Sequence, residues 1–347
     1  MTEINTTKPE FEVPERYARI DKANEQSFYM TDADRSFDVI MSVHSAGQRR
    51  EGVRKADDGE LKKHTPEEIG FINERNKAAR FILAGNMSTV VLPDGKAPYG
   101  PSELTDSERT EDAQGNMKRH FENIGIDPAT VRVLNPERTY HESPLSVVNA
   151  DEDDSVYDGV EPIKLKERGD LILSYNPDIV FAVRPADCPV AIMSAETPQG
   201  KINMMLHFAW RGPAYGQFED MEREFDKLGV DLSTLEVYIT PGGQTESYRV
   251  TNFIPDDSKE NPTPAEGDLF VGVEEHLDEN GVARYDFGID TPLAVYNAFL
   301  ELGLDQKQVF LDTSATTDLS SGNGSHSRAS NQKEDNVRDI VTAQFHG

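Results

Sequence analysis

Hydrophobic residues along the chain fall into short runs separated by polar loops. Three runs in the middle, 178–183, 190–193 and 201–210, are almost wholly apolar and partly β-branched, and they are short enough to be buried strands. Further strands are predicted at 36–44, 130–135, 234–240 and 308–313. The pattern therefore predicts a β-rich core whose central strands are covered on both faces.

Helical periodicity fills several segments between these strands. The clearest helix covers 212–229 and stops at Gly229, and its apolar face is formed by Phe218, Met221, Phe225 and Leu228. A second helix begins with Thr291 as N-cap and Pro292 as first residue. Further helices are predicted over 66–84, 106–124 and 336–345. Because strands and helices alternate, the fold class is α/β or α+β.

The chain shows neither an internal repeat nor a clear domain linker. Residues 1–35 are polar with little periodicity, so we expect a flexible or loosely docked tail there. The acidic run 149–158 is expected to be a solvated loop, and 255–268 is a Pro-rich acidic loop. The sequence thus predicts one domain over 36–347.

Charge narrows the partners that the protein can have. Sixty-three Asp and Glu residues against 35 Lys and Arg give a net charge of -28, which repels nucleic-acid polymers and anionic membranes. A small anionic substrate stays compatible if Arg and Lys cluster locally. The chain has no apolar run of membrane-spanning length, no secretory pattern at its beginning and a single cysteine, so we expect a cytoplasmic protein.

Three residues stand out as candidates for chemistry: His141, Cys188 and His207. Each lies at or beside the end of a predicted strand, where α/β folds place functional groups. One thiolate and two imidazoles are three of the four ligands of a tetrahedral zinc, and a catalytic zinc keeps its fourth position open. The alternative interpretations are a small buried cysteine and hydrogen-bonded core histidines.

The segments around these residues resemble a known family. "GDLILSYNPDIVFAVRPADCPVAIM" and "GKINMMLHFAWRGPAYG" are similar to the A-D-C-x-P and H-x-G-W-R-G elements of the laccase-domain family, whose members are also called polyphenol oxidases or peptidoglycan editing factors. "RVLNPERTYHESPLSVV" resembles its Q-V-H-G element, and "VYITPGGQTESYRV" and "DTSATTDLSSGNGSHSRASNQKEDNVRDIV" resemble its later segments. Five elements occur in the family's order, over residues 106–347.

The resemblance is that of a divergent member. His207 is followed by Phe208 and Ala209 instead of Ala-Gly, and Arg138 and Glu142 stand near the upstream histidine in place of the family's glutamine and glycine. Late cysteines of the family are replaced by serine or threonine. The residues that match the family's three metal ligands are all retained.

The resemblance implies a single-domain, layered α-β-β-α sandwich with mixed sheets. It implies one Zn²⁺ held by His141, Cys188 and His207, and phosphorolysis of adenosine, inosine or methylthioadenosine together with adenosine deamination. A zinc-bound water has a pKa near 7 and could supply hydroxide to adenine. Copper fits less well, because multicopper oxidases need H-x-H pairs and none of the eight histidines here belongs to one.

Other residues near these segments are candidates for roles around this centre. Asp187 is expected to orient a histidine or carry a proton to the base. Arg211, at the start of the helix opened by Gly212, is expected to bind phosphate, with a surface ion pair as the alternative. Arg184 and Arg328 are further candidates for substrate anions. Trp210 is expected to pack in a core. The predicted partners are therefore a small nucleoside and phosphate.

Two other functions are compatible with the sequence. Cys188 could act as a thiolate nucleophile with His207 or His141 as its base, which would make the protein a cysteine hydrolase or amidase in peptidoglycan precursor editing. The chain could also be a non-catalytic acidic binding protein.

Overall fold

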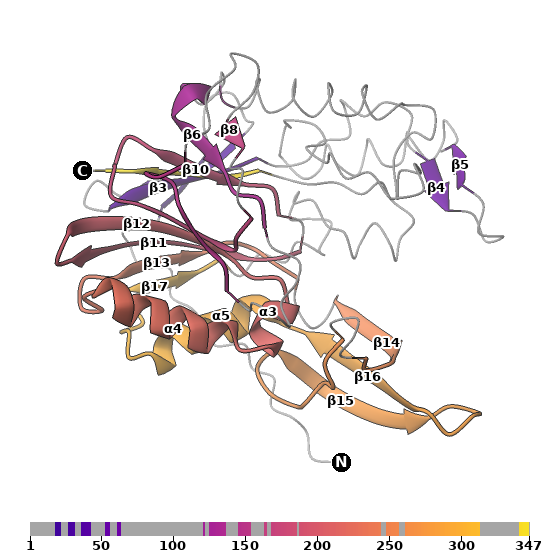
Figure 1. Cartoon of the computed structure of the whole chain (residues 1–347). Coiled ribbons are helices and arrows are strands. Elements are labelled where there is room, and N and C mark those ends of the chain that lie inside the picture. The colour runs from indigo at the N-terminus through magenta and orange to yellow at the C-terminus, as the bar shows by residue number, and fades with distance from the viewer. Residues whose placement is uncertain are drawn as a thin grey trace.

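Two large mixed β-sheets lie face to face and form the body of the protein (Figure 1). This computed structural model describes residues 18–21, 27–31, 36–42, 53–55, 61–63, 121, 125–136, 145–153, 163–164, 168–185, 187–243, 248–256, 261–312 and 340–346. Among these residues, no helix is both long and apolar enough to cross a bilayer.

One large sheet has seven strands in the order β1-β2-β3-β18-β10-β6-β8. Its strands are β1 Ala18–Asp21, β2 Ser27–Thr31, β3 Phe37–Ser42, β6 Val131–Val133, β8 Ile163–Lys164, β10 Val180–Val183 and β18 Val341–Phe345. The sheet is mixed, because β10 runs antiparallel to β18 and parallel to β6.

The other large sheet has six strands in the order β17-β13-β11-β12-β9-β7. Its strands are β7 Val147–Asn149, β9 Leu171–Ser174, β11 Val190–Thr197, β12 Gly200–His207, β13 Glu236–Ile239 and β17 Val309–Leu311. A hairpin of β11 and β12 forms its centre, paired from Val190↔His207 to Thr197↔Gly200. This register fixes which residues meet at each end of the hairpin.

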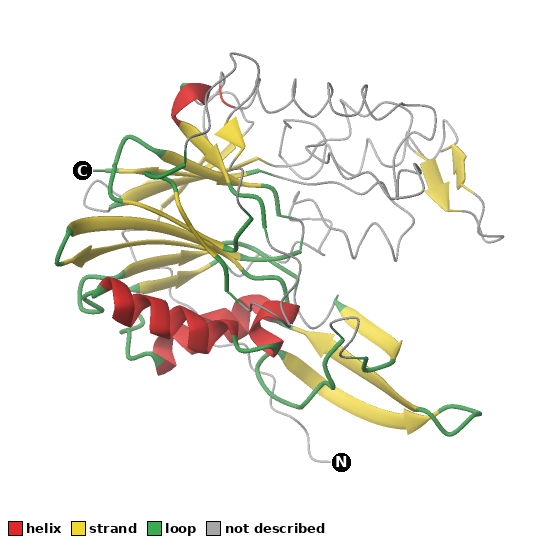
Figure 2. Ribbon diagram, viewed as in Figure 1, coloured by secondary structure: helices red, strands yellow, loops and turns green. Residues whose placement is uncertain are grey.

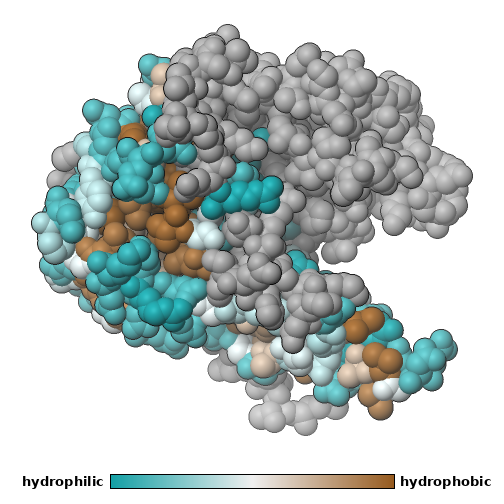
Figure 3. All heavy atoms as spheres, in the orientation of Figure 1, coloured by the Kyte–Doolittle hydropathy of each residue, from teal (hydrophilic) through white to brown (hydrophobic). Residues whose placement is uncertain are grey.

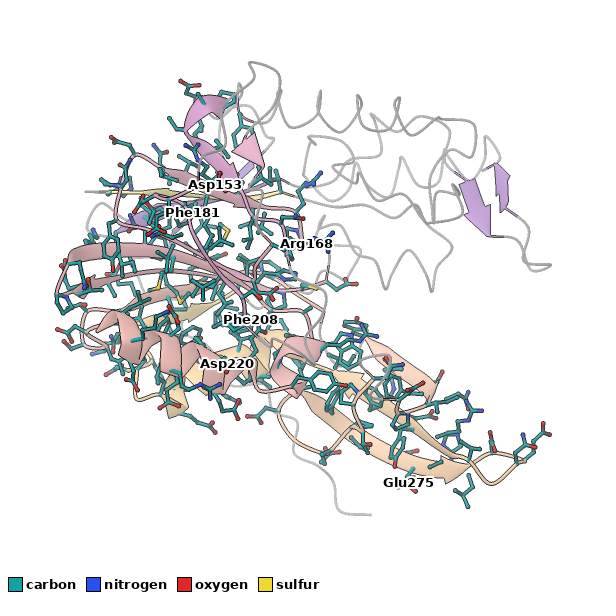
Figure 4. The ribbon with its side chains drawn as sticks, viewed as in Figure 1. Asp153, Arg168, Phe181, Phe208, Asp220 and Glu275 are labelled. Atoms are coloured by element: carbon teal, nitrogen blue, oxygen red, sulfur yellow. The ribbon has the colours of Figure 1, made fainter. Side chains whose placement is uncertain are left out.

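Alternating side chains of β11 fill two separate cores. Val190 and Ile192 face the core between the two large sheets, whereas Ala191 and Met193 face the core under the helices. Figure 4 shows Phe181 in the first core and Phe208 on the helix side of the six-stranded sheet. Burial on both faces explains why these strands read as continuous apolar runs.

Helices cover the outer face of the six-stranded sheet (Figure 2). They are α3 Arg211–Ala214, α4 Gln217–Leu228 and α5 Thr291–Glu301. Met221 and Phe225 of α4 and Phe299 of α5 pack into the core beneath them. The predicted helix over 212–229 is corrected to two helices, because the chain turns at Gly216 with φ of 93°, a left-handed conformation that glycine tolerates.

The mixed α/β class predicted from the sequence is confirmed, with few helices and several mixed sheets. Three layers of the expected α-β-β-α sandwich are formed by described residues: the two large sheets and the helix layer on the six-stranded sheet. Of the helix predicted over 106–124, only Phe121 belongs to the described part; it is helical and packs on the outer face of β6 and β10. The helix predicted over 66–84 lies outside the described residues.

Two predictions for the chain ends are wrong where the structure describes them. Residues 18–21 and 27–31, expected in a flexible tail, form β1 and β2, and β2 pairs with β3. The helix predicted over 336–345 is corrected to strand β18, which lies between β3 and β10. Its alternate residues Val341, Ala343 and Phe345 enter the core between the sheets, which is the two-residue period of a strand.

Two small sheets complete the described structure. β14 Arg249–Phe253, β15 Phe270–Leu277 and β16 Ala283–Ile289 form a three-stranded sheet, here called the β-arm, which projects from the body in Figure 1. β4 Val53–Lys55 and β5 Leu61–Lys63 form a two-stranded sheet, and η2 Pro128–Thr130 is a short 3-10 helix. The sequence pattern missed the β-arm, because its outer strands, RVTNF and FVGVEEHL, mix apolar and polar residues without a regular alternation.

Asp290 rather than Thr291 caps α5: its carboxylate accepts a hydrogen bond from the Leu293 N–H at 3.1 Å. The Asp290→Ala variant is expected to lower the free energy of unfolding by about 1 kcal/mol. Urea unfolding followed by circular dichroism checks this value. A Thr291→Ala variant should cost less, and an equal or larger cost would place the cap at Thr291.

Candidate functional site

Cys188 and His207 meet at one end of the β11–β12 hairpin. Cys188 lies between β10 and β11, two residues before Val190, and Val190 is paired with His207 at the end of β12. The ladder continues past the strand ends, because the Phe208 N–H donates to the Pro189 carbonyl at 3.0 Å. Strand register therefore brings together two of the three residues predicted as ligands, and the Cys188 side chain hydrogen-bonds the imidazole.

Asp170 holds the other side of the His207 ring. It directly precedes β9, the second neighbour of β12, and the His207 N–H donates to its carbonyl at 2.9 Å. The Nδ1 atom of His207 lies 3.1 Å from Oδ1 of Asp170. Asp170 is fully buried and His207 is 6% exposed, so the contact is shielded from water. Three adjacent strand ends thus align a carboxylate, an imidazole and a thiol.

This environment changes the protonation of His207. Burial by itself lowers its pKa, but the charge of Cys188 and the hydrogen bonds with Asp170 and Cys188 outweigh burial and raise the pKa to about 9. In the absence of a metal the imidazole therefore holds its proton at neutral pH. A metal cation that binds here must displace that proton.

A pH dependence of stability follows for the metal-free protein. The pKa of His207 in the folded protein lies above its ordinary value near 6.5, so protonation of His207 stabilises the fold. This stabilisation is complete below pH 6.5 and disappears as the pH rises through about 9. Relative to a His207→Gln variant, the chelator-treated protein is expected to lose at least ~1 kcal/mol of unfolding free energy between pH 7 and pH 10. Urea titrations across this range measure the difference. A difference that stays constant with pH would contradict the raised pKa.

A buried glutamine fixes the backbone of His207 from the helix side. Gln217, the first residue of α4, is fully buried, and its Nε2 donates to the His207 carbonyl at 3.1 Å. Gly212 leaves room for this side chain, since a Cβ atom there would overlap the Gln217 carboxamide. The end of β12 is therefore anchored to α4 as well as to its neighbouring strands.

The turn after β13 supports the Cys188 loop from the other side. The Gly243 N–H donates to the Asp187 carbonyl at 2.8 Å, and the Val190 N–H donates to the Thr240 hydroxyl at 2.9 Å. A Cβ atom on Gly242 would lie 3.0 Å from both the Asp187 carbonyl oxygen and Cδ of Pro189. Asp187 itself is buried. Its predicted role in orienting a histidine or carrying a proton stays a prediction.

Arg211 is engaged with protein groups next to the site. Its Nη2 donates to Oδ1 of Asn261 at 3.0 Å, and its guanidinium lies 4.4 Å from the centre of the Trp210 ring. Trp210 packs edge-on against Phe253 and Phe270, which confirms the packing role predicted for it. The helix that Arg211 begins has only four residues, so helix-dipole support for an anion is small. Phosphate binding by Arg211 stays a prediction.

The remaining predicted site residues are placed only in part. Arg184 follows β10 at the start of the Cys188 loop and is half-buried. His141 and Arg328, together with Arg138 and Glu142, lie outside the described residues. Within the described ranges, no group of three or more His, Cys, Asp or Glu side chains is arranged to hold a metal ion. The described part therefore contributes Cys188 and His207 as donors.

Sequence reasoning missed Asp170 and Gln217. Asp170 could have been noticed from the sequence, because it directly precedes the apolar strand LILS, which is wholly buried. A carboxylate at such a position is itself buried and needs a specific partner. Its partner is 37 residues away, so no local motif links the two. Gln217 carried no signal, because its position on the helix reads as one more polar residue.

Comparison with family models shows to which protein family this chain belongs. The family model described as "multi-copper polyphenol oxidoreductase laccase" matches residues 96–333. The chain belongs to this family. The match includes Asp170, Cys188 and His207, so the carboxylate, imidazole and thiol at the three strand ends lie within the family's domain.

Solved structures show the same fold at low sequence identity. The structure of the hypothetical protein YfiH from Bacillus licheniformis has a TM-score of 0.55 and 14% identity, with 93% of this chain and 97% of that chain covered. YlmD from Geobacillus stearothermophilus has a TM-score of 0.57 and 15% identity, with 96% and 100% covered.

A third solved structure, the Neisseria meningitidis protein NMB0706, has a TM-score of 0.51 and 16% identity, with 91% of this chain and 96% of that chain covered. No curated protein matches the sequence. The chain is therefore a divergent member of the laccase-domain family with a YfiH-like α+β fold.

Proposed function

We propose that this protein is a zinc-dependent enzyme acting on purine nucleosides, by phosphorolysis of adenosine, inosine or methylthioadenosine and by deamination of adenosine. The observation that carries the proposal is the row Asp170, His207 and Cys188 at three adjacent strand ends of a laccase-domain fold. Its proposed small-molecule partners are a nucleoside and phosphate.

The donors at this row fit a zinc ion. Thiolate sulfur and imidazole nitrogen are the donors that zinc prefers, and His141 is the proposed third ligand. Asp170 binds Nδ1 of His207, which leaves Nε2 as the nitrogen for the metal. Zinc would supply Lewis-acid polarisation when bound. Copper fits the row less well, because the chain has eight histidines and no H-x-H pair for a multicopper centre.

The chain's own residues divide the remaining tasks. Asp170 and Gln217 hold the ring and the carbonyl of His207, so its nitrogen keeps one direction. Asp187, buried beside Cys188, is the proposed proton carrier for the purine base. Arg184, Arg211 and Arg328 are the proposed groups for phosphate and ribose oxygens.

The test is incubation of purified, metal-analysed protein with adenosine, inosine and methylthioadenosine, with and without phosphate. If the enzyme is a phosphorylase, free purine base should form only when phosphate is present. If it deaminates adenosine, inosine should form from adenosine without phosphate, and chromatography detects both products. The Cys188→Ser protein serves as the control and should form neither product. Absence of both products from protein that contains one zinc per chain would contradict the proposal.

A second function is favoured by the same geometry. A thiol next to an imidazole whose other nitrogen is bound by a carboxylate is also the arrangement of nucleophile, base and orienting group in a cysteine hydrolase. Such an enzyme could hydrolyse amide bonds of peptidoglycan precursors. Rapid alkylation of Cys188 by iodoacetamide without a chelator supports the hydrolase, whereas alkylation only after metal removal supports the zinc enzyme.

A further inference from the structure

Within the part of the chain that the structure describes, β15 forms an edge of the β-arm that pairs with no further strand. The arm has the order β14-β16-β15, so β15 pairs with β16 on one side only. Figure 1 shows this hairpin extending away from the two large sheets. The arm is attached to the body by its base, where Phe270 and Phe287 pack with Trp210.

The hairpin register shows which backbone groups face outward. The Asp278 N–H donates to the Val282 carbonyl at 3.0 Å, so this pair is a hydrogen-bonded one. Hydrogen-bonded and non-hydrogen-bonded pairs alternate along antiparallel strands. Glu275 and Leu277, opposite Tyr285 and Ala283, are therefore in non-hydrogen-bonded positions and direct their N–H and C=O groups toward the open edge.

Among the described residues, one side chain covers the inner part of this edge. The carboxylate of Glu266 accepts hydrogen bonds from the Gly272 N–H at 3.0 Å and the Val273 N–H at 2.7 Å. No described residue covers the outer side of Glu275 and Leu277 in the same way. Natural proteins usually protect an open edge along its length, so an edge protected over half its length is suited to pairing with another strand.

The side chains along the open half are apolar and acidic. Leu277 is 67% exposed and Val282 is 43% exposed, and Figure 3 shows hydrophobic residues at the surface of the arm. Glu274 and Glu275 are exposed, and Glu274 lies opposite Asp286, so two carboxylates stand across from each other. Like charges in this arrangement are unfavourable unless a cation lies beside them.

We infer that the outer edge of β15 binds an extended basic segment of a partner protein, which pairs as an additional strand. Backbone groups of Glu275 and Leu277 would bond the segment, and two consecutive basic side chains of the segment would neutralise Glu275 on one face and Glu274 on the other. An apolar side chain two residues from the one beside Glu275 would cover Leu277, which lies on the same face as Glu275. A second copy of this chain is the poorer occupant, because each copy carries a net charge of -28 and would bring the same carboxylates to the edge.

The test uses a fluorescently labelled peptide of Lys-Lys-Leu-Leu repeats, which places a lysine and a leucine two residues apart on each face of the strand, with anisotropy as the readout. Three further reagents separate strand pairing from bulk charge. One is an N-methylated form of the peptide, which keeps the charge but loses backbone donors, and the others are two charge-matched protein variants. The arm variant is Glu274→Lys with Glu275→Lys. The control variant is Glu222→Lys with Asp226→Lys on the exposed face of α4.

The inference predicts about tenfold weaker binding for the arm variant and for the N-methylated peptide, and binding within about twofold of the native protein for the control variant. Equal binding of the two peptides, or equal weakening by both variants, would overturn it. Sedimentation of the native chain as a dimer that the arm variant abolishes would also overturn it, in favour of a second copy. Thermal melting of both variants verifies that each is folded.

Discussion

Replacing Cys188 with serine is expected to abolish binding of the proposed zinc ion. Zinc binds a thiolate far better than a hydroxyl group, and Cys188 is the only cysteine in the sequence. Metal content after dialysis should fall from about one zinc per chain to a small fraction of that, and nucleoside turnover should fall at least about hundredfold. Inductively coupled plasma mass spectrometry and chromatographic assays measure the two effects.

A histidine far from the site provides the control for this loss. His276 lies exposed on the β-arm, so a His276→Ala protein should keep its zinc and its turnover. A Cys188→Ser protein that retains a full zinc complement but loses turnover would contradict the ligand role. That result would favour Cys188 as a nucleophile.

Replacing Asp170 with asparagine is expected to weaken metal binding without removing any proposed ligand. The carboxylate binds Nδ1 of His207 at 3.1 Å, fixes the ring and makes Nε2 a better donor. An amide of the same shape keeps the packing but loses the charge. Zinc affinity, measured by competition with a chelating dye, should fall about tenfold to hundredfold.

The Asp170→Asn effect is separated from general loss of charge by a matched variant. Asp278 is bonded to Arg284 at the tip of the β-arm, and Asp278→Asn should leave zinc affinity unchanged. Equal losses in both variants, or none in the Asp170→Asn protein, would show that Asp170 does not support the metal. Unfolding midpoints of the two metal-free proteins show whether either variant is simply unstable.

The sequence predicted the parts of the fold whose pattern is local. Strands at 180–183, 190–197 and 200–207 are apolar on both faces because they lie between two cores, and such runs are read directly from the chain. The sequence pattern predicts a helix over 336–345, where the structure has strand β18, because so short a segment fits either the helical or the strand period. Its place between β3 and β10 is set by contacts far away in sequence.

In the candidate site, too, local sequence predicts some residues, whereas others depend on contacts between segments that are distant in sequence. Cys188 and His207 could be predicted from their unusual residue types at strand ends and from the family resemblance. Asp170 could not, because its role depends on β9 lying beside β12. The separate helices α3 and α4 also depend on one residue, Gly216, whose left-handed conformation the sequence alone does not fix.

X-ray absorption at the zinc edge of the purified protein tests the metal centre most directly. One sulfur at about 2.3 Å and two imidazole nitrogens at about 2.0 Å are expected, from Cys188, His207 and His141. A first shell of nitrogen and oxygen alone, or protein that binds no zinc after exposure to it, would contradict a metal centre at these strand ends.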